Sequence, residues 1–311
     1  MSKPIAALQM DPLEDINIDG DSSFVLGLEA VRRGYQLFHY GVDSLCYDHG
    51  KITARGAFVT LQRVVGAHFL QQTQTTLDLS ECRVILMRQD PPFDMQYIAA
   101  THLLEQVGCL VVNDPVAVRN APEKLLVTHF HDLMPPSMIT RDQEALRAFR
   151  HIHGAIIVKP LFGNGGVGVF YLQKDDANFD SLIEMMLANS REQIMAQKFI
   201  PRVVEGDKRI ILVDGKIGGA INRVPQSGQI RSNMHVGGQA VACVLDARDH
   251  EICERLHDIL LEQNLIFTGI DIIDGYLTEI NVTSPTGLQE VARFGGPALE
   301  RDIWDAIEER L

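Results

Sequence analysis

The sequence predicts an α/β protein with two domains. The chain has 311 residues, about twice the length of an ordinary domain. Strand-like and helix-like segments alternate up to about residue 120, which is typical of a mostly parallel sheet covered by helices. Several strand-like segments follow one another after Ala155, which is typical of antiparallel pairing. We therefore expect an N-terminal α/β domain over residues 1–121, with a Rossmann-like arrangement, and a second domain over residues 122–311.

The first domain is expected to open with a buried strand from Ile5 to Met10. Asp21 is a favourable N-cap for a helix that runs to about Arg33, and Gly34 follows where a C-cap glycine belongs. Asp48-His49-Gly50 predicts a turn between two strand-like pieces. The further predicted elements are strands at 35–40, 83–87 and 109–112, and a helix at about 94–107 that follows Pro91-Pro92.

The second domain begins near Pro122, which suits the first turn of a helix that carries Glu123 and Lys124. Asp214-Gly215 predicts a tight turn between two consecutive strands, and residues 226–238 predict a loop. The other predicted strands are 134–139, 156–159, 167–172, 194–199, 208–213, 216–222, 267–273 and 277–282, and the predicted helices are 142–151, 178–189, 249–263 and a closing helix from about 297.

Charge and hydropathy argue against two classes of partner. The chain has 28 Lys and Arg against 41 Asp and Glu, which gives a formal net charge of −13. Such a surface repels nucleic-acid phosphates and anionic lipids, so we expect neither a nucleic acid nor a membrane as partner. No apolar run approaches the roughly 20 residues that span a bilayer, and the start of the chain lacks the apolar core of a secretory signal.

The cysteines predict a reducing environment. There are five, at scattered positions, and no two of them form a Cys-x-x-Cys pair. We therefore expect neither a disulfide framework nor a zinc site, and we expect a cytoplasmic location.

The segment Gly163–Gly168 matches G-x-G-x-x-G but does not fit a dinucleotide site. Such a site needs a helix directly after the glycines, whereas strand-like Val167 to Leu172 follows here. A glycine-rich loop between strands can still cradle phosphates with backbone N–H groups, and the alternative is a flexible loop without a ligand. Lys159, at the end of an apolar strand, favours phosphate binding, and Lys124 is a second candidate. Either lysine taken alone is more often an ordinary surface residue.

Two neighbouring strands carry three oxygen ligands, Asp271, Glu279 and Asn281. A two-residue turn at Asp274-Gly275 places Asp271 and Glu279 on opposite faces, whereas a three-residue connection or a bulge makes them face each other. The second register also gathers four apolar side chains on the other face, namely Ile270, Ile272, Ile280 and Val282. We therefore expect one acidic face. Two adjacent carboxylates repel each other without a cation, which favours a Mg²⁺ site over a face exposed to water.

Other polar residues are candidates for ligand contacts. The strand end Gln197–Ile200, before a proline, is either a clamp for a purine or a plain strand end. Arg209 and Arg223 suit phosphate or carboxylate oxygens. Arg231 and Asn233 lie in the 226–238 loop, where a lid over a reaction centre is expected.

Two charged residues follow a buried strand of the first domain. The ends of strands are where ligands bind in an open α/β sheet, so Arg88 and Asp90 either contact a ligand or are solvated loop charges. No arrangement of histidine, serine or cysteine predicts a covalent nucleophile.

Taken in order, these segments resemble the ATP-grasp ligases, and within them the bacterial glutathione synthetases. The resemblance covers nearly the whole chain. Its most telling segments are Met-Arg-Gln-Asp-Pro-Pro-Phe-Asp at 87–94, Gly-Asp-Lys-Arg at 206–209 and Glu-Ile-Asn-Val-Thr-Ser-Pro-Thr at 279–286. The lysines, the glycine-rich loop and the Glu-x-Asn pair are common to ATP-grasp enzymes, whereas the motifs of the first domain and the Thr-Ser-Pro-Thr run are what point to the narrower group.

The resemblance implies an ATP-grasp fold, with a central lobe at about 122–195 and a C-terminal lobe at about 196–311. It implies ATP and Mg²⁺, with Mn²⁺ as a possible substitute, and activation of the γ-glutamylcysteine carboxylate as an acyl phosphate that glycine attacks. It also implies a homotetramer or homodimer. The residues implied to contact ATP are Lys124, Lys159, Gly163, Asn164, Gly165, Gly166, Gln197, Lys198, Phe199, Ile200 and Asp207; those implied to hold the metal are Asp271, Glu279 and Asn281; those expected to act in catalysis are Arg209, Arg223 and Asn233.

The sequence differs from the family pattern at two places, and two other functions are alternatives to this interpretation. The glycine-rich loop begins Phe162-Gly163 where the family has Asp-Gly, and the lid stretch 232–236 carries His235; both departures would alter the lid rather than the chemistry. One rival is another ATP-grasp ligase, which joins two D-alanines or adds glutamate to an amine. The other is a non-catalytic nucleotide-binding protein, which would have no need of paired carboxylates.

Overall fold

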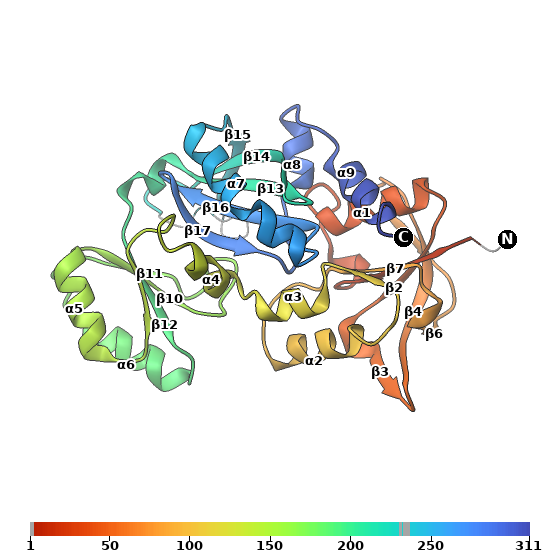
Figure 1. Ribbon diagram of the computed structural model, residues 1–311, viewed down its shortest axis with the longest axis horizontal. Coiled ribbons are helices and arrows are strands. Elements are labelled where there is room, and N and C mark those ends of the chain that lie inside the picture. Colours follow the sequence, from red (N-terminus) through yellow and green to blue (C-terminus); the bar gives the residue numbers. More distant parts are fainter. Residues whose placement is uncertain (1–2, 230–231, 233–236) are drawn as a thin grey trace.

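Three β-sheets organise the molecule (Figure 1). The computed structural model describes residues 3–229, 232 and 237–311. Helices and strands are mixed throughout, so the predicted α/β class is confirmed. The sheet formed by the N-terminal strands lies at one end of the elongated molecule, a small sheet with two helices lies at the other end, and the third sheet lies between them (Figure 1).

The first sheet combines a parallel and an antiparallel half. Its parallel half runs in the order β2-β1-β7-β8, as the alternating pattern predicts. Its antiparallel half is built on one long strand, β4, and extends the sheet beyond β2. The strands are β1 (Ile5–Gln9), β2 (Gln36–Tyr40), β3 (Leu45–Asp48), β4 (Lys51–Leu61), β5 (Phe69–Gln71), β6 (Thr75–Asp78), β7 (Val84–Met87) and β8 (Leu110–Val112).

Helices from both ends of the chain pack on this sheet. Asp21 caps α1 (Ser22–Arg32), as predicted, by accepting a hydrogen bond from the Phe24 N–H. The last helix, α9 (Leu299–Glu308), buries Trp304 completely, and its indole N–H donates to the Leu26 carbonyl of α1 at 2.9 Å. The C-terminal end of the chain therefore returns to the N-terminal sheet. The helices α2 (Met95–Leu104) and α3 (Pro115–Asn120) follow β7 and β8, and α3 is not apparent in the sequence pattern.

The second sheet carries the glycine-rich segment. It is antiparallel, in the order β11-β10-β12-β9, with α5 and α6 on one face. The predicted strand 167–172 begins only at Phe170, because Gly165, Gly166 and Gly168 adopt positive φ angles that interrupt extended pairing. The elements are β9 (Ser137–Thr140), α5 (Gln143–His153), β10 (Ile156–Pro160), β11 (Phe170–Leu172), α6 (Phe179–Asn189) and β12 (Ile194–Lys198).

The third sheet is also antiparallel, in the order β15-β14-β13-β16-β17. A single-turn helix, α4 (Glu123–Leu126), precedes the second sheet, and Pro122 is its N-cap rather than part of its first turn as predicted. Both β15 and α8 are absent from the sequence prediction. The elements are β13 (Asp207–Val213), β14 (Lys216–Val224), β15 (Gln239–Ala242), α7 (Ala247–Glu262), β16 (Phe267–Ile273), β17 (Tyr276–Asn281) and α8 (Leu288–Arg293).

The predicted acidic face of β16 and β17 is confirmed, and the structure shows how the register achieves it. The turn itself is the two-residue Asp274-Gly275, with Ile273 paired to Tyr276. A bulge then inserts one extra residue on β17, so that Asp271 pairs with Glu279. The four apolar side chains expected on the other face are buried, as predicted; they are Ile270, Ile272, Ile280 and Val282.

Among the residues that the structure describes, no helix is long and apolar enough to cross a membrane.

Candidate active site

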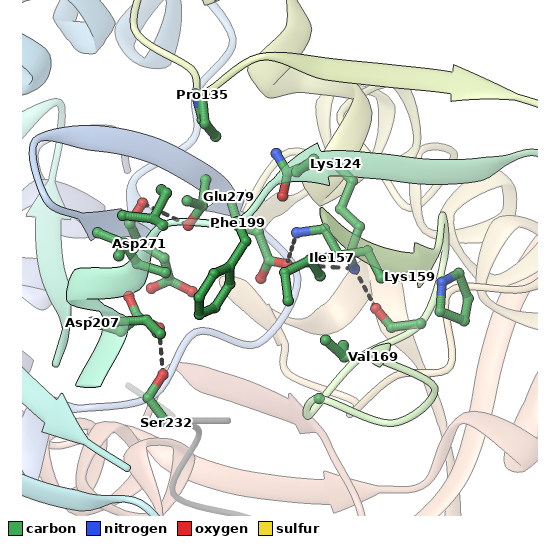
Figure 2. A pocket seen from close by; sticks show the side chains of 18 of the residues that line it. Lys124, Pro135, Ile157, Lys159, Val169, Phe199, Asp207, Ser232, Asp271 and Glu279 are labelled. Atoms are coloured by element: carbon green, nitrogen blue, oxygen red, sulfur yellow. Dashed lines mark hydrogen bonds and ion pairs between the residues drawn. The ribbon is translucent and has the colours of Figure 1, made fainter. Parts of the chain in front are cut away.

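A large cavity lies between the second and third sheets and encloses about 920 Å³ of empty space, part of it open to solvent. Most of the candidate residues meet there (Figure 2). The candidates that line it are Lys124, Lys159, Gly163, Asn164, Gly165, Gly166, Gln197, Lys198, Phe199, Ile200, Asp207, Asp271 and Glu279. Segments far apart in the sequence therefore converge on one site.

Lys159 reaches the cavity because of the alternation of β10. Ile156 and Val158 point into the core under α5 and α6, so Ile157 and Lys159 point the other way and line the cavity. Lys159 is 6% exposed, and its ammonium donates to Glu279 Oε1 at 3.1 Å. The alternative of an ordinary surface lysine is wrong for this residue.

Lys124 is also buried, at 3% exposure. Its ammonium donates to the Gly163 carbonyl at the start of the glycine-rich loop and lies 3.8 Å from Glu279 Oε1 (Figure 2). Two ammonium groups therefore flank one carboxylate beneath the loop. Burial alone would raise the pKa of Glu279, but the charges of Lys124 and Lys159 outweigh it and lower that pKa.

The glycine-rich loop folds back on the strand that precedes it. Gly168 has a φ of +71°, and a Cβ there would lie 2.9 Å from the Pro160 ring, so only glycine fits this position without a shift. Between its ends, the loop turns through Gly165 and Gly166, both with positive φ. Such a run of glycines allows backbone N–H groups to approach an anion closely.

Asp271 is the most strongly paired carboxylate of the cavity. Arg209 holds it with two hydrogen bonds, from Nε at 2.5 Å and from Nη2 at 2.9 Å, and Arg223 Nη2 lies 3.0 Å away. Burial would raise the pKa of Asp271, but the two guanidinium groups hold it well below its usual range. Neither arginine lines the cavity itself; both act on it through Asp271.

Asp207 is the second carboxylate that Arg223 contacts. One of its oxygens accepts from Arg223 and from the Ser232 hydroxyl, the latter at 2.9 Å. The other, Oδ1, is buried with no hydrogen-bond partner among the described residues. Burial outweighs the arginine here and raises the pKa of Asp207 to about 6.

The trio Asp271, Glu279 and Asn281 fits a hard divalent cation. The two carboxylates face each other across the strand pair, and the Asn281 amide donates to Asp271 Oδ2 at 3.3 Å. No group of three or more His, Cys, Asp or Glu in the described part of the chain is arranged to hold a metal. A cation here would therefore take two carboxylates and complete its shell with amide, phosphate or water oxygens, which is the usual manner of Mg²⁺.

The segment Gln197–Ile200 is tied into the second sheet. The Gln197 amide donates to the Ser137 hydroxyl at 3.0 Å, and the Phe199 ring lies 4.5 Å from Tyr171. The backbone N–H groups of Lys198 and Phe199 already donate to Pro136 and Ala155. A purine edge would therefore have to bind the remaining backbone groups of this segment.

Two expected lid residues, Arg231 and Asn233, lie outside the described residues.

Arg88 belongs to a second polar cluster, at the carboxyl ends of β1 and β7. It is 6% exposed, its Nε donates to the Ser23 hydroxyl at 3.0 Å, and its Nη2 donates to the Pro285 carbonyl at 2.8 Å. The interpretation as a solvated loop charge is wrong for Arg88, whereas Asp90 is exposed and accepts from the Ser284 hydroxyl at 2.8 Å. The 284–286 run also reaches Arg209, which donates to the Thr286 carbonyl, and so connects the two clusters.

Sequence reasoning missed Glu123 as a residue of the site. Its carboxylate lies 4.0 Å from the Lys124 ammonium and is 17% exposed. Burial and the charge of Glu279 raise its pKa to about 7. The one signal in the sequence is its position beside Lys124.

This shift predicts a pH-dependent effect of Glu123→Gln on stability. The folded state binds the Glu123 proton more tightly than the unfolded state, so the native carboxylate loses stability as pH rises from about 4.5 to about 7. In nucleotide-free, metal-free protein, Glu123→Gln is expected to raise the unfolding free energy by about 1–3 kcal/mol at pH 8 and by much less at pH 5. Urea denaturation measures the unfolding free energy at both pH values, and the same substitution at the exposed residue Glu184, Glu184→Gln, is the control. An equal gain at both pH values would contradict the prediction.

Two family models match the chain. Residues 5–119 match the N-terminal domain of prokaryotic glutathione synthetase, and residues 123–296 match its ATP-grasp domain. The chain is 52% identical to the glutathione synthetase of Agrobacterium fabrum, over 98% of this chain and 96% of the relative. It is 40% identical to the glutathione synthetase of Vibrio parahaemolyticus, over 97% of each.

Solved structures share the fold at low sequence identity. D-cycloserine synthetase DcsG superposes with a TM-score of 0.69 at 17% identity, covering 98% of this chain and 99% of that one. D-alanyl-alanine synthetase A from Vibrio cholerae gives a TM-score of 0.65 at 13% identity, covering 99% of this chain and 98% of that one. At these identities the likeness concerns the fold alone.

Proposed function

The chain belongs to the prokaryotic glutathione synthetase family, and from this premise we propose that its large cavity binds ATP and that the cluster around Arg88 binds γ-glutamylcysteine. The fold is an ATP-grasp fold. The protein is an ATP-dependent ligase that makes glutathione from γ-glutamylcysteine and glycine, and it uses a divalent metal ion. One observation carries the assignment of the cavity: two buried lysines and two carboxylates converge beneath a glycine-rich loop.

In this proposal the nucleotide displaces contacts that the protein makes with itself. Lys124 and Lys159 exchange Glu279 for phosphate oxygens, and the backbone of residues 163–166 covers those oxygens. The Gln197–Ile200 segment holds the adenine beside the Phe199 ring. Asp207, whose Oδ1 is buried without a partner among the described residues, offers an acceptor to the ribose hydroxyls.

We propose Mg²⁺ as the metal, held by Asp271, Glu279 and Asn281. These residues offer oxygen ligands alone, which suits Mg²⁺ and also Mn²⁺. Bound there together with ATP, the ion would neutralise phosphate charge. The protein's own part is to keep both carboxylates ionised, which the four cationic side chains around them do; these are Lys124, Lys159, Arg209 and Arg223.

The second cluster suits the dipeptide. Arg88 offers a buried guanidinium for a carboxylate, and the Ser23 hydroxyl and the backbone around Pro285 lie within its reach. The 284–286 run then leads from Arg88 to Arg209 beside the ATP cavity. The dipeptide's reacting carboxylate would therefore lie at the end nearer to the phosphates.

The reaction follows from this arrangement. An oxygen of the cysteinyl carboxylate attacks the γ-phosphorus, the bond to the ADP oxygen breaks, and an acyl phosphate forms. The glycine nitrogen then attacks the acyl carbon and loses a proton, and phosphate leaves. Arg209 and Arg223 are our candidates for stabilising the charge that develops on the oxygens in both steps. Asn233 remains a candidate from sequence alone.

Transfer of oxygen tests the acyl phosphate. With ¹⁸O in the cysteinyl carboxylate of γ-glutamylcysteine, one labelled oxygen is expected in the released phosphate, because that oxygen bridges carbon and phosphorus in the intermediate. Mass spectrometry of the phosphate measures it. Unlabelled phosphate formed together with glutathione would contradict the acyl-phosphate route.

Three further properties remain proposals. We assign residues 1–121 and 122–311 as two domains, with lobes at 122–195 and 196–311, which the three separate sheets support. We also propose a cytoplasmic location, which five free thiols support. A homodimer or homotetramer is the expected assembly, on the resemblance to the family.

A further inference from the structure

Phe162, the residue directly before the glycine-rich loop, is stacked on the first domain. Its ring lies 6.2 Å from the Phe93 ring with an angle of 22° between the planes, and Phe93 lies 5.1 Å from Tyr97. Both phenylalanines are half-buried against the same core as the buried Leu161. An aspartate at this position would form no such stack.

The Phe93–Phe162 stack joins the two halves of the proposed reaction site. On one side, Phe93 follows Arg88 and Asp90 at the end of β7, where the dipeptide is proposed to bind. On the other side, Phe162 precedes Gly163, whose carbonyl accepts from Lys124. Between the two sides lies a small pocket of about 260 Å³, part of it open to solvent, lined by Pro91, Phe93, Pro122, Glu123, Lys124, Leu161, Phe162 and Asn164.

The loop has little stiffness of its own, so its anchors decide where it lies. Gly165, Gly166 and Gly168 all have positive φ, and glycine backbones are the least restricted. Pro160 packs against Gly163 and Gly168 and closes the base of the loop, but Pro160 is the last residue of β10, the strand that leads directly into the loop. The Phe93–Phe162 stack, by contrast, ties the loop to the connection between β7 and α2 in the first domain.

We propose that Phe162 is a positioning residue whose stack on Phe93 holds the glycine-rich loop over the reacting groups and keeps water from the acyl phosphate until glycine attacks. This inference rests on the proposed function. When the anchor is lost, water attacks the phosphorus, the bond between phosphorus and the carboxylate oxygen breaks, and free dipeptide and phosphate leave, with the proton going to solvent. ADP is then made without glutathione.

Release of ADP in the absence of glycine measures this leak. With MgATP and γ-glutamylcysteine alone, Phe162→Asp and Phe162→Leu are expected to release ADP about 2- to 10-fold faster than the unchanged protein, as expected for loss of one aromatic pair. With glycine added, less glutathione is expected per ADP. Phe93→Leu should increase ADP release to the same extent. The double variant Phe93→Leu/Phe162→Leu should release ADP no faster than either single variant, because each substitution removes the same contact.

Phe58→Leu is the matched control. Its ring pairs with Phe38 at 5.3 Å in the first sheet, away from the loop, and the leak is expected to stay unchanged. An unchanged leak in folded Phe162→Leu and Phe162→Asp would overturn the inference, as would additive effects in the double variant. If the unchanged protein forms no glutathione from the complete mixture, the proposed function fails instead, so the two failures are distinguishable.

Discussion

Arg223→Ala is expected to lower kcat by about 100- to 1000-fold, the usual effect of removing one charge-stabilising donor from an active site. ATP affinity is expected to fall far less, by about tenfold or less, since Arg223 does not line the cavity. The guanidinium is 4% exposed and contacts both Asp207 and Asp271. Its Nε is buried and has no hydrogen-bond partner among the described residues.

Steady-state kinetics and nucleotide titration separate the two effects of Arg223→Ala. Arg202→Ala is the matched control, because Arg202 belongs to the same part of the chain, its side chain is 61% exposed and pairs with Glu205 and Asp274, and none of these three residues lines the cavity. It should leave kcat unchanged. Arg223→Lys keeps the positive charge but lacks the planar guanidinium, so its kcat is expected to lie between those of the unchanged protein and Arg223→Ala. A folded Arg223→Ala protein with unchanged kcat would remove Arg223 from the mechanism.

Glu279→Gln is expected to lower kcat/KM at fixed Mg²⁺ by about 100-fold or more, with partial recovery at high Mg²⁺. The substitution replaces one of two carboxylates proposed to hold the ion, and neutral amides bind hard cations less strongly. It also leaves the ammonium groups of Lys124 and Lys159 without the carboxylate they share. Tighter rather than weaker binding of metal-free ATP is therefore expected, because the lysines no longer have an internal partner.

The opposite signs of these two effects make the test of Glu279→Gln specific. Binding of ATP is measured with chelator and with Mg²⁺, and activity is measured across a Mg²⁺ titration. Glu205→Gln, an exposed carboxylate on the same domain, is the control. Loss of ATP binding both with and without metal would contradict the assignment of Glu279 as a metal ligand, and so would an unchanged Mg²⁺ dependence.

Local patterns explain why much of the site could be predicted. The alternation of Ile156, Val158 and Lys159 places the lysine opposite the core, and this follows from strand geometry alone. The acidic face of β16 and β17 was predictable because only one register buries four apolar side chains together. A strand rather than a helix follows Gly168, as predicted, although its pairing starts later than expected, at Phe170.

Long-range pairing explains what the sequence did not predict. The sequence left a three-residue connection and a bulge open, and the choice of a bulge on β17, opposite Asp271 and Ile272, depends on how two strands settle after a two-residue turn. The contacts of Arg209 and Arg223 with Asp271, and the burial of Glu123, arise only when distant segments meet. Short elements such as α3, α8 and β15 carry too few residues for a periodic pattern.

The central claim is that this cavity couples ATP cleavage to the joining of γ-glutamylcysteine and glycine. The most direct test measures ADP and glutathione formed by purified protein with MgATP, γ-glutamylcysteine and glycine, omitting each in turn. We expect glutathione only in the complete mixture, with one ADP per glutathione and little ADP when a substrate is missing. ADP release without glutathione from the complete mixture, or product formed instead from D-alanine or glutamate, would contradict it.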